Sequence, residues 1–172
     1  MFQERLKMAK RKSKITAKFK NWTDKMLNDA NFFLEYNFGK IARRAVDNLR
    51  KNYNIETNAL VESVKAKVHF KQSRAKKRRG GSIWAGVGID KDVQATKNGK
   101  IRKPVHYAHL IEKGFTHYPD GKKIEGKPFL MPAVNSVTGG SRAIERKLYQ
   151  VIENASKGID NEFEDFKMEF KK

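Results

Sequence analysis

The chain reads VKAKVHFK over residues 64–71, so apolar residues alternate with lysines and one histidine. A period of two is typical of a β-strand with one buried and one solvent-facing side. A second alternation, IWAGVGI over residues 83–89, follows a basic segment that contains two glycines. These stretches predict two paired strands, with one apolar face and one cationic face.

Long helices are expected before and after this pair of strands in the sequence. From Thr23 to Tyr53, apolar residues recur at steps of three and four, and Thr23 with Asp24 can cap the start. A second such stripe runs from Ile144 to Phe170 and predicts a final helix. The order indicates an α+β fold, a small antiparallel sheet packed with a long N-terminal helix and a long C-terminal helix. We expect a single domain at 23–172.

The segments between the second strand and the final helix have weaker patterns. Residues 92–103 are polar and contain a turn-forming Asn98-Gly99 pair. Val105 and Tyr107 favour a short strand that runs into a helical turn ending at Gly114. Residues 118–127 are rich in glycine and lysine and favour a loop.

The net charge of +19, from 38 basic and 19 acidic side chains, is the strongest compositional signal. A field of this size requires neutralisation by nucleic acid, an acidic membrane surface or acidic proteins. The chain has no cysteine, which excludes disulfides and thiolate metal sites. No apolar run approaches the roughly 20 residues needed to cross a bilayer.

The positive charge is concentrated in two segments, a basic N-terminal arm at 1–22 and a basic finger at 72–81 between the two strands. The arm suits either a loose chain or a helix that orders on a partner. The finger suits phosphates, acidic surfaces of a neighbouring subunit, a channel through which DNA passes, or simply solvent, and Trp84 or Phe70 offers a stacking face nearby. The candidate binding or assembly residues are Lys10, Arg11, Lys12, Arg74, Lys76, Lys77, Arg78 and Arg79.

Two further motifs follow the strands. Residues 105–116 read VHYAHLIEKGFT, and residues 126–133 read GKPFLMPA. At this spacing they resemble the tail-completion, or head-tail-joining, proteins of long-tailed bacteriophages. Those proteins carry a Tyr-Ala pair, a Glu-x-Gly-Thr-like step and a Pro-Phe-Leu-x-Pro-Ala segment that opens a C-terminal helix. The residues that carry the resemblance are Tyr107, Ala108, Glu112, Gly114, Pro128, Phe129, Leu130 and Pro132.

The same residues have a structural interpretation. Pro128 and Pro132 bias Lys127 and Met131 to extended conformations, which would aim Phe129 in a defined direction. Gly114 can end a helical turn at positive φ, and Glu112 can hold a backbone amide or a lysine. We expect these residues to build a corner of the core rather than to contact a partner directly.

No catalytic site, metal site or cofactor is expected, and we predict that the protein is not an enzyme. His106, His109 and His117 with Glu112 lack the spacing of a metal motif. Asp90 and Asp92 are better explained as a solvated strand end than as a divalent-cation centre. The glycines between residues 80 and 88 lack the lysine and spacing of a phosphate-binding loop.

The resemblance implies a structural virion protein of the phage neck, made in the host bacterial cytoplasm and located at the head-tail junction. It implies a ring of identical copies, with six-fold symmetry, between a head connector or stopper protein and a tail terminator or tail-tube protein. Contact with the DNA backbone is a further expectation, and no membrane is involved. The alternative is a nonspecific nucleic-acid-binding protein that acts through its arm and finger.

Overall fold

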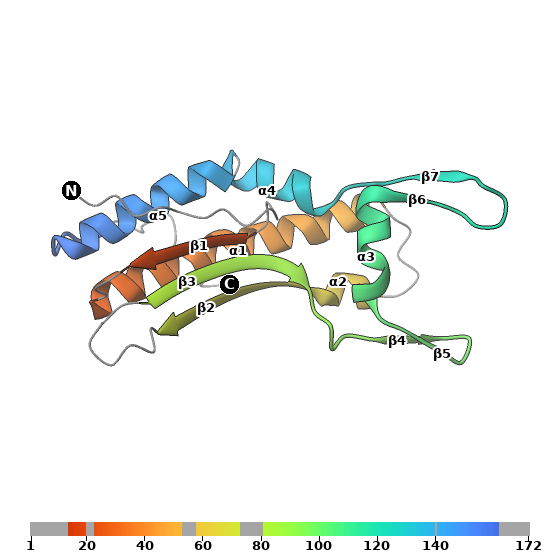
Figure 1. Cartoon of the computed structure of the whole chain (residues 1–172), viewed down its shortest axis with the longest axis horizontal. Coiled ribbons are helices and arrows are strands. Elements are labelled where there is room, and N and C mark those ends of the chain that lie inside the picture. Colours follow the sequence, from red (N-terminus) through yellow and green to blue (C-terminus); the bar gives the residue numbers. More distant parts are fainter. Residues whose placement is uncertain (1–13, 20–22, 53–57, 73–80, 140, 162–172) are drawn as a thin grey trace.

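The computed structural model describes residues 14–19, 23–52, 58–72, 81–139 and 141–161. It has an α+β fold in which a three-stranded antiparallel sheet and two C-terminal helices pack around one long helix (Figure 1). The elements in chain order are β1 (Lys14–Phe19), α1 (Asp24–Asn52), α2 (Ala59–Ser63), β2 (Val64–Gln72), β3 (Gly81–Ile89), β4 (Ala95–Lys97), β5 (Lys100–Arg102), α3 (Pro104–Lys113), β6 (Gly114–Thr116), β7 (Lys123–Glu125), α4 (Leu130–Thr138) and α5 (Ser141–Ser156).

Helix α1 is the centre of the fold, as its apolar periodicity predicts. The Met26 amide donates to Thr23 Oγ1 at 3.2 Å, which confirms the predicted cap. One side of α1 packs against β2 and β3, and it also contacts α4 and α5. Because α1 is covered on more than one side, its buried residues form a wide stripe: Met26, Ala30, Phe33, Leu34, Tyr36, Phe38, Ile41, Ala45 and Leu49.

The sheet confirms the predicted pairing of the two alternating stretches. Strands β2 and β3 are antiparallel, with Val68 opposite Ala85 and His69 opposite Trp84. Ile83 and Ala85 are fully buried on the face that covers α1. The order β1-β3-β2 places β3 in the middle, which explains why its inward side chains are more deeply buried than those of β2.

Strand β1 corrects the expectation for the N-terminal arm. Six residues of that segment, Lys14–Phe19, form an edge strand antiparallel to β3 instead of a loose chain or a helix. The edge of β3 offers unpaired backbone N–H and C=O groups that an extended segment can satisfy. The rest of the arm lies outside the described residues.

The final helix is shorter than predicted. It ends at Ser156 because Gly158 adopts a φ of +74°, and the Ile159 amide bonds to the Asn154 carbonyl at 3.0 Å. This is the Schellman arrangement that terminates helices. Ile159 was predicted to lie in the apolar stripe but is half exposed beyond the helix, and residues 162–172 are outside the described part of the chain.

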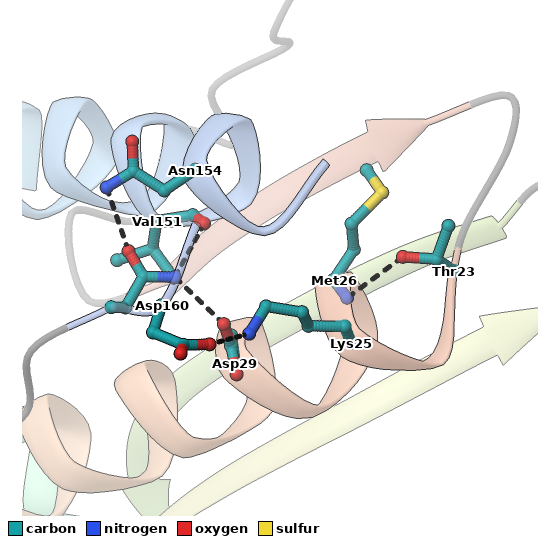
Figure 2. A network of polar contacts seen from close by, with 8 residues as sticks. Thr23, Lys25, Met26, Asp29, Val151, Asn154 and Asp160 are labelled. Atoms are coloured by element: carbon teal, nitrogen blue, oxygen red, sulfur yellow. Dashed lines mark hydrogen bonds and ion pairs between the residues drawn. The ribbon is translucent and has the colours of Figure 1, made fainter. Parts of the chain in front are cut away.

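A polar network ties the segment after α5 to the first turns of α1 (Figure 2). Asn161 Nδ2 donates to Asp29 Oδ2 at 2.8 Å and to the Val151 carbonyl at 3.0 Å. Lys25 forms an ion pair with Asp160 beside these bonds. The network therefore closes the end of the molecule at which α1 begins.

The opposite end differs from the sequence prediction. The stretch predicted as a strand and a helical turn is one helix, α3, in which Pro104 occupies the first position, where a missing N–H is tolerated. Two short hairpins, β4–β5 and β6–β7, stand where polar loops were predicted and extend from this end (Figure 1). Asn98 and Gly99 both have positive φ and form the turn of β4–β5, as predicted from their pairing in the sequence.

Among the helices of the described residues, none combines the length and apolar character needed to cross a membrane.

Candidate interaction surfaces

Glu112, at the end of α3, binds the start of α4. Its Oε2 accepts hydrogen bonds from the amides of Phe129 at 2.8 Å and Leu130 at 3.1 Å. Its Oε1 accepts a third from the Met131 amide, also at 3.1 Å. A helix start leaves such N–H groups without partners within the helix, and a negative charge there is favourable. The expectation that Glu112 holds a backbone amide is confirmed.

A close backbone crossing lies next to this cap. Gly114 ends α3 at a φ of +80°, and a Cβ placed there would lie 2.5 Å from both the Gly126 nitrogen and the Ile124 carbonyl oxygen. The Lys127 amide donates to the Ile111 carbonyl at 3.0 Å. The predicted role of Gly114 is confirmed, and only glycine fits this position.

These contacts join both halves of the motif that resembles tail-completion proteins, and we call them the hairpin root. Phe129 is 2% exposed and lies in the core, and its carbonyl accepts from Asn48 Nδ2 of α1 at 3.0 Å. Ala108 is also buried, and burial raises the pKa of the Tyr107 phenol. The interpretation as a corner of the core holds for Phe129 and Ala108, whereas Pro128 is exposed.

One prediction for this motif is wrong. Met131 is not extended, because α4 starts at Leu130 and contains Met131 and Pro132 in its first turn. A proline is tolerated there since its missing N–H has no partner within the helix. The Met131 amide finds its partner in Glu112 instead.

The hairpin β6–β7 projects from this root and carries apolar side chains on its surface. Phe115 and Ile124 are directly opposite each other and therefore share one face, with exposed fractions of 36% and 39%. Tyr118, near the tip, is 92% exposed. Large apolar side chains gathered on a projecting element are typical of a protein contact surface.

The tip of this hairpin is held by its own hydrogen bonds. Asp120 Oδ1 lies 2.7 Å from His117 Nδ1, and the His117 amide donates to the Lys122 carbonyl at 2.8 Å. The contact with His117, with a backbone hydrogen bond from Lys122, lowers the pKa of the Asp120 carboxyl below its ordinary value. The tip therefore presents Tyr118 from a structured turn.

A second surface, which we call the basic sheet face, is the side of β2 and β3 that points away from α1. Four successive outward positions of β2 are Lys65, Lys67, His69 and Lys71, and all are exposed. His69 contacts Trp84 of β3, with ring centroids 5.6 Å apart. Of the two aromatic residues proposed for stacking, Trp84 belongs to this face.

Phe70 has the other orientation. It alternates with the outward residues of β2 and packs, partly buried, against the core. Phe70 is therefore not available as a stacking surface on the basic sheet face.

Asp90 is not the solvated strand end that we expected. Its side chain is 10% exposed, and its Oδ2 lies 2.9 Å from Lys65 Nζ. The hydrogen bond from Lys65, and a weaker one from the Asp92 amide, lower the pKa of the Asp90 carboxyl. The same pair raises the pKa of Lys65. Asp90 therefore fixes the start of β2 to the end of β3.

The histidines of the sequence are not gathered into one site. His106 and His109 are exposed on α3, whereas His117 contacts Asp120 on the hairpin tip. Glu112 is occupied by the amides of α4. Within the described ranges, no group of three or more His, Asp or Glu side chains is placed to hold a metal ion.

The candidate basic residues of the arm and finger lie outside the described residues. They are Lys10, Arg11, Lys12, Arg74, Lys76, Lys77, Arg78 and Arg79. In the sequence, β2 and β3 of the basic sheet face flank the finger, and β1 lies within the arm.

Comparisons of the chain with protein-family models, with curated proteins and with solved structures give no match.

Proposed function

We propose that this chain is a structural protein of the bacteriophage neck that assembles with its own copies and with neighbouring proteins at the head-tail junction. The observation that carries the proposal is the hairpin root. Both halves of the motif that resembles tail-completion proteins meet there, where Glu112 binds three amides of the Phe129–Met131 turn.

The hairpin root supports an assembly function because it anchors a hairpin that exposes large apolar side chains. A hairpin with exposed Phe115, Tyr118 and Ile124 is costly to leave in water and gains by burial against a protein. Aromatic residues in such positions dominate many protein interfaces. A hairpin that is anchored at its base also loses little conformational freedom when it binds.

The resemblance supplies the proposed setting. In a neck, the copies form a ring of six between a head connector or stopper protein and a tail terminator or tail-tube protein. The net charge of +19 suits such a place, where acidic neighbouring subunits or the passing DNA neutralise it.

Complementation of a phage genome from which the coding sequence has been deleted tests this function. Without the chain, separate heads and tails are expected in electron micrographs, and the wild-type gene is expected to restore joined particles. The double variant Phe115→Ser with Ile124→Ser is expected to fail, with far-ultraviolet circular dichroism unchanged. Particles that join normally without the chain would overturn the proposal.

A matched variant separates the hairpin from general surface effects. Ile159 is also exposed, but it lies beyond α5 at the opposite end of the molecule. Ile159→Ser therefore removes the same kind of side chain elsewhere and is expected to restore joining as well as the wild type. If both variants restore joining equally, the hairpin β6–β7 is not the assembly surface.

A further inference from the structure

The basic sheet face combines three features that the assembly function does not use. Lys67 and Lys71 are exposed, and neither β2 nor β3 has an acidic residue among its outward positions. Gly86 and Ser82 stand opposite these lysines, so the residues of β3 at these two positions are small. Trp84 lies between Ser82 and Gly86 along β3, and its ring contacts His69.

The third strand extends the same rows. The register places Lys14 opposite Gly86 and Lys18 opposite Ser82. Each of the two rows thus has a lysine on β1 and a lysine on β2, with a small residue of β3 between them. In the row between these two, Thr16 stands opposite Trp84.

This arrangement is complementary to a flexible polyanion with aromatic bases. Lysines bind phosphates without demanding a fixed geometry, and an aromatic ring between small residues offers a surface on which a base can stack. From Lys67 to Lys71 the strand covers about 13 Å, the length of about four stacked nucleotides. An acidic protein would use the lysines but not the aromatic ring.

We propose that the basic sheet face binds single-stranded nucleic acid, with Lys67 and Lys71 on the phosphates and a base stacked on Trp84. This inference does not depend on the neck function, because it concerns a different surface and is tested with the purified chain alone. Lys65 is less suited to this role, since it is paired with Asp90.

The first test measures binding of a fluorescein-labelled 15-nucleotide oligothymidine by anisotropy at several salt concentrations. The variant Lys67→Gln with Lys71→Gln is expected to bind about tenfold more weakly, with a salt slope reduced by about 1.4 for two lost phosphate contacts. The matched control is Arg146→Gln with Lys147→Gln, which removes two exposed charges from α5. The control is expected to stay within about twofold of the wild type.

The second test reads Trp84 directly. The chain has two tryptophans, so Trp22→Phe leaves Trp84 as the only one. Its fluorescence is expected to be quenched as the oligonucleotide binds, and Lys67→Gln with Lys71→Gln is expected to shift the quenching to higher concentration.

Three results would overturn the inference. The first is an equal loss of affinity in the sheet and α5 variants. The second is binding without any change in Trp84 fluorescence and with the same affinity for duplex DNA. The third is binding of polyglutamate as tight as that of the oligonucleotide, which would show a surface for acidic polypeptides instead.

Discussion

The hairpins β2–β3 and β6–β7 are built from the same secondary structure but expose opposite chemistry. In β2–β3 the apolar residues, such as Ile83, point onto α1, and lysines face the solvent. In β6–β7, Phe115 and Ile124 on the shared face are both exposed. The first hairpin buries its apolar side chains within the single chain, whereas the second leaves large apolar side chains exposed.

The difference shows which part of each hairpin determines its stability. The hairpin β2–β3 is stabilised along its whole length by burial of one face. Besides the pairing of its two short strands, the hairpin β6–β7 is held at its root, through Glu112 and the crossing of Gly114 with Gly126, and at its tip through Asp120. The apolar side chains in its middle therefore contribute little to the core of the chain.

The largest expected difference between the hairpins comes from one substitution made in each. Ile83→Ala removes a fully buried side chain and is expected to lower the free energy of unfolding by about 2–5 kcal/mol. Ile124→Ala removes a side chain that is 39% exposed and is expected to change it by less than about 0.5 kcal/mol. Urea denaturation followed by circular dichroism measures both. Equal losses would show that β6–β7 is as much part of the core as β2–β3.

The next effect concerns the hairpin root. Glu112→Ala leaves the three amides at the start of α4, those of Phe129, Leu130 and Met131, without their acceptor and is expected to cost about 2–3 kcal/mol in the free energy of unfolding. Glu112→Gln keeps one acceptor oxygen and is expected to cost less. Glu125→Ala, an exposed change on β7, is the control and is expected to have little effect. A loss in Glu112→Ala no larger than in this control would refute the cap.

The smallest expected effect concerns the ion pair of Lys65 with Asp90 at the base of β2–β3, whose contribution to stability depends on pH. Lys65 lowers the pKa of Asp90, so the folded state resists protonation more than the unfolded chain. The stabilisation by Asp90 is full above the ordinary aspartate pKa of about 3.9. It disappears as the pH falls through the lower pKa that Asp90 has in the folded state. Asp90→Asn is expected to be less stable than the wild type at neutral pH, and the gap is expected to narrow below about pH 4.

Urea denaturation at a series of pH values measures this gap. Asp92→Asn is the control, because the Asp92 side chain is exposed and makes no direct ion pair with Lys65, and the hydrogen bond to Asp90 comes from the Asp92 backbone amide. A gap for Asp90→Asn that stays constant down to pH 2 would contradict the ion pair with Lys65.

Periodicity predicted the parts of the fold that bury a continuous stripe. Helix α1 and the pair β2–β3 follow their apolar repeats closely, since each repeat is long enough to set the type of structure by itself. The start of α5 was likewise clear, but Gly158 and the network around Asn161 end it early. A single glycine outweighed an apolar stripe that continues to Phe170.

The missed elements depend on contacts that no local pattern contains. Strand β1 forms because the edge of β3, more than sixty residues later, completes its hydrogen bonds. The strands of β6–β7 have three residues each and no buried face, so nothing in their composition separates them from a loop. In α3, the alternation of Val105 and Tyr107 suggested a strand, but Pro104 at the first position favours a helix.

Of the candidate sites, the sequence located the cationic face of β2 and suggested that Glu112 binds backbone amides. It could not show that those amides belong to Phe129, Leu130 and Met131, since the two segments are joined only by the fold. Gly126 was also not singled out, although a Cβ there would collide with the backbone of α3 and Gly114.

The crossing of Gly114 and Gly126 makes the projecting hairpin a modular appendage. Because the chain leaves the body and returns to it at two touching points, residues can be inserted or removed between them without shifting α3 or α4. The length of the hairpin and the sequence of its tip can thus vary independently of the rest of the molecule. Substitutions can accumulate there while the body stays the same.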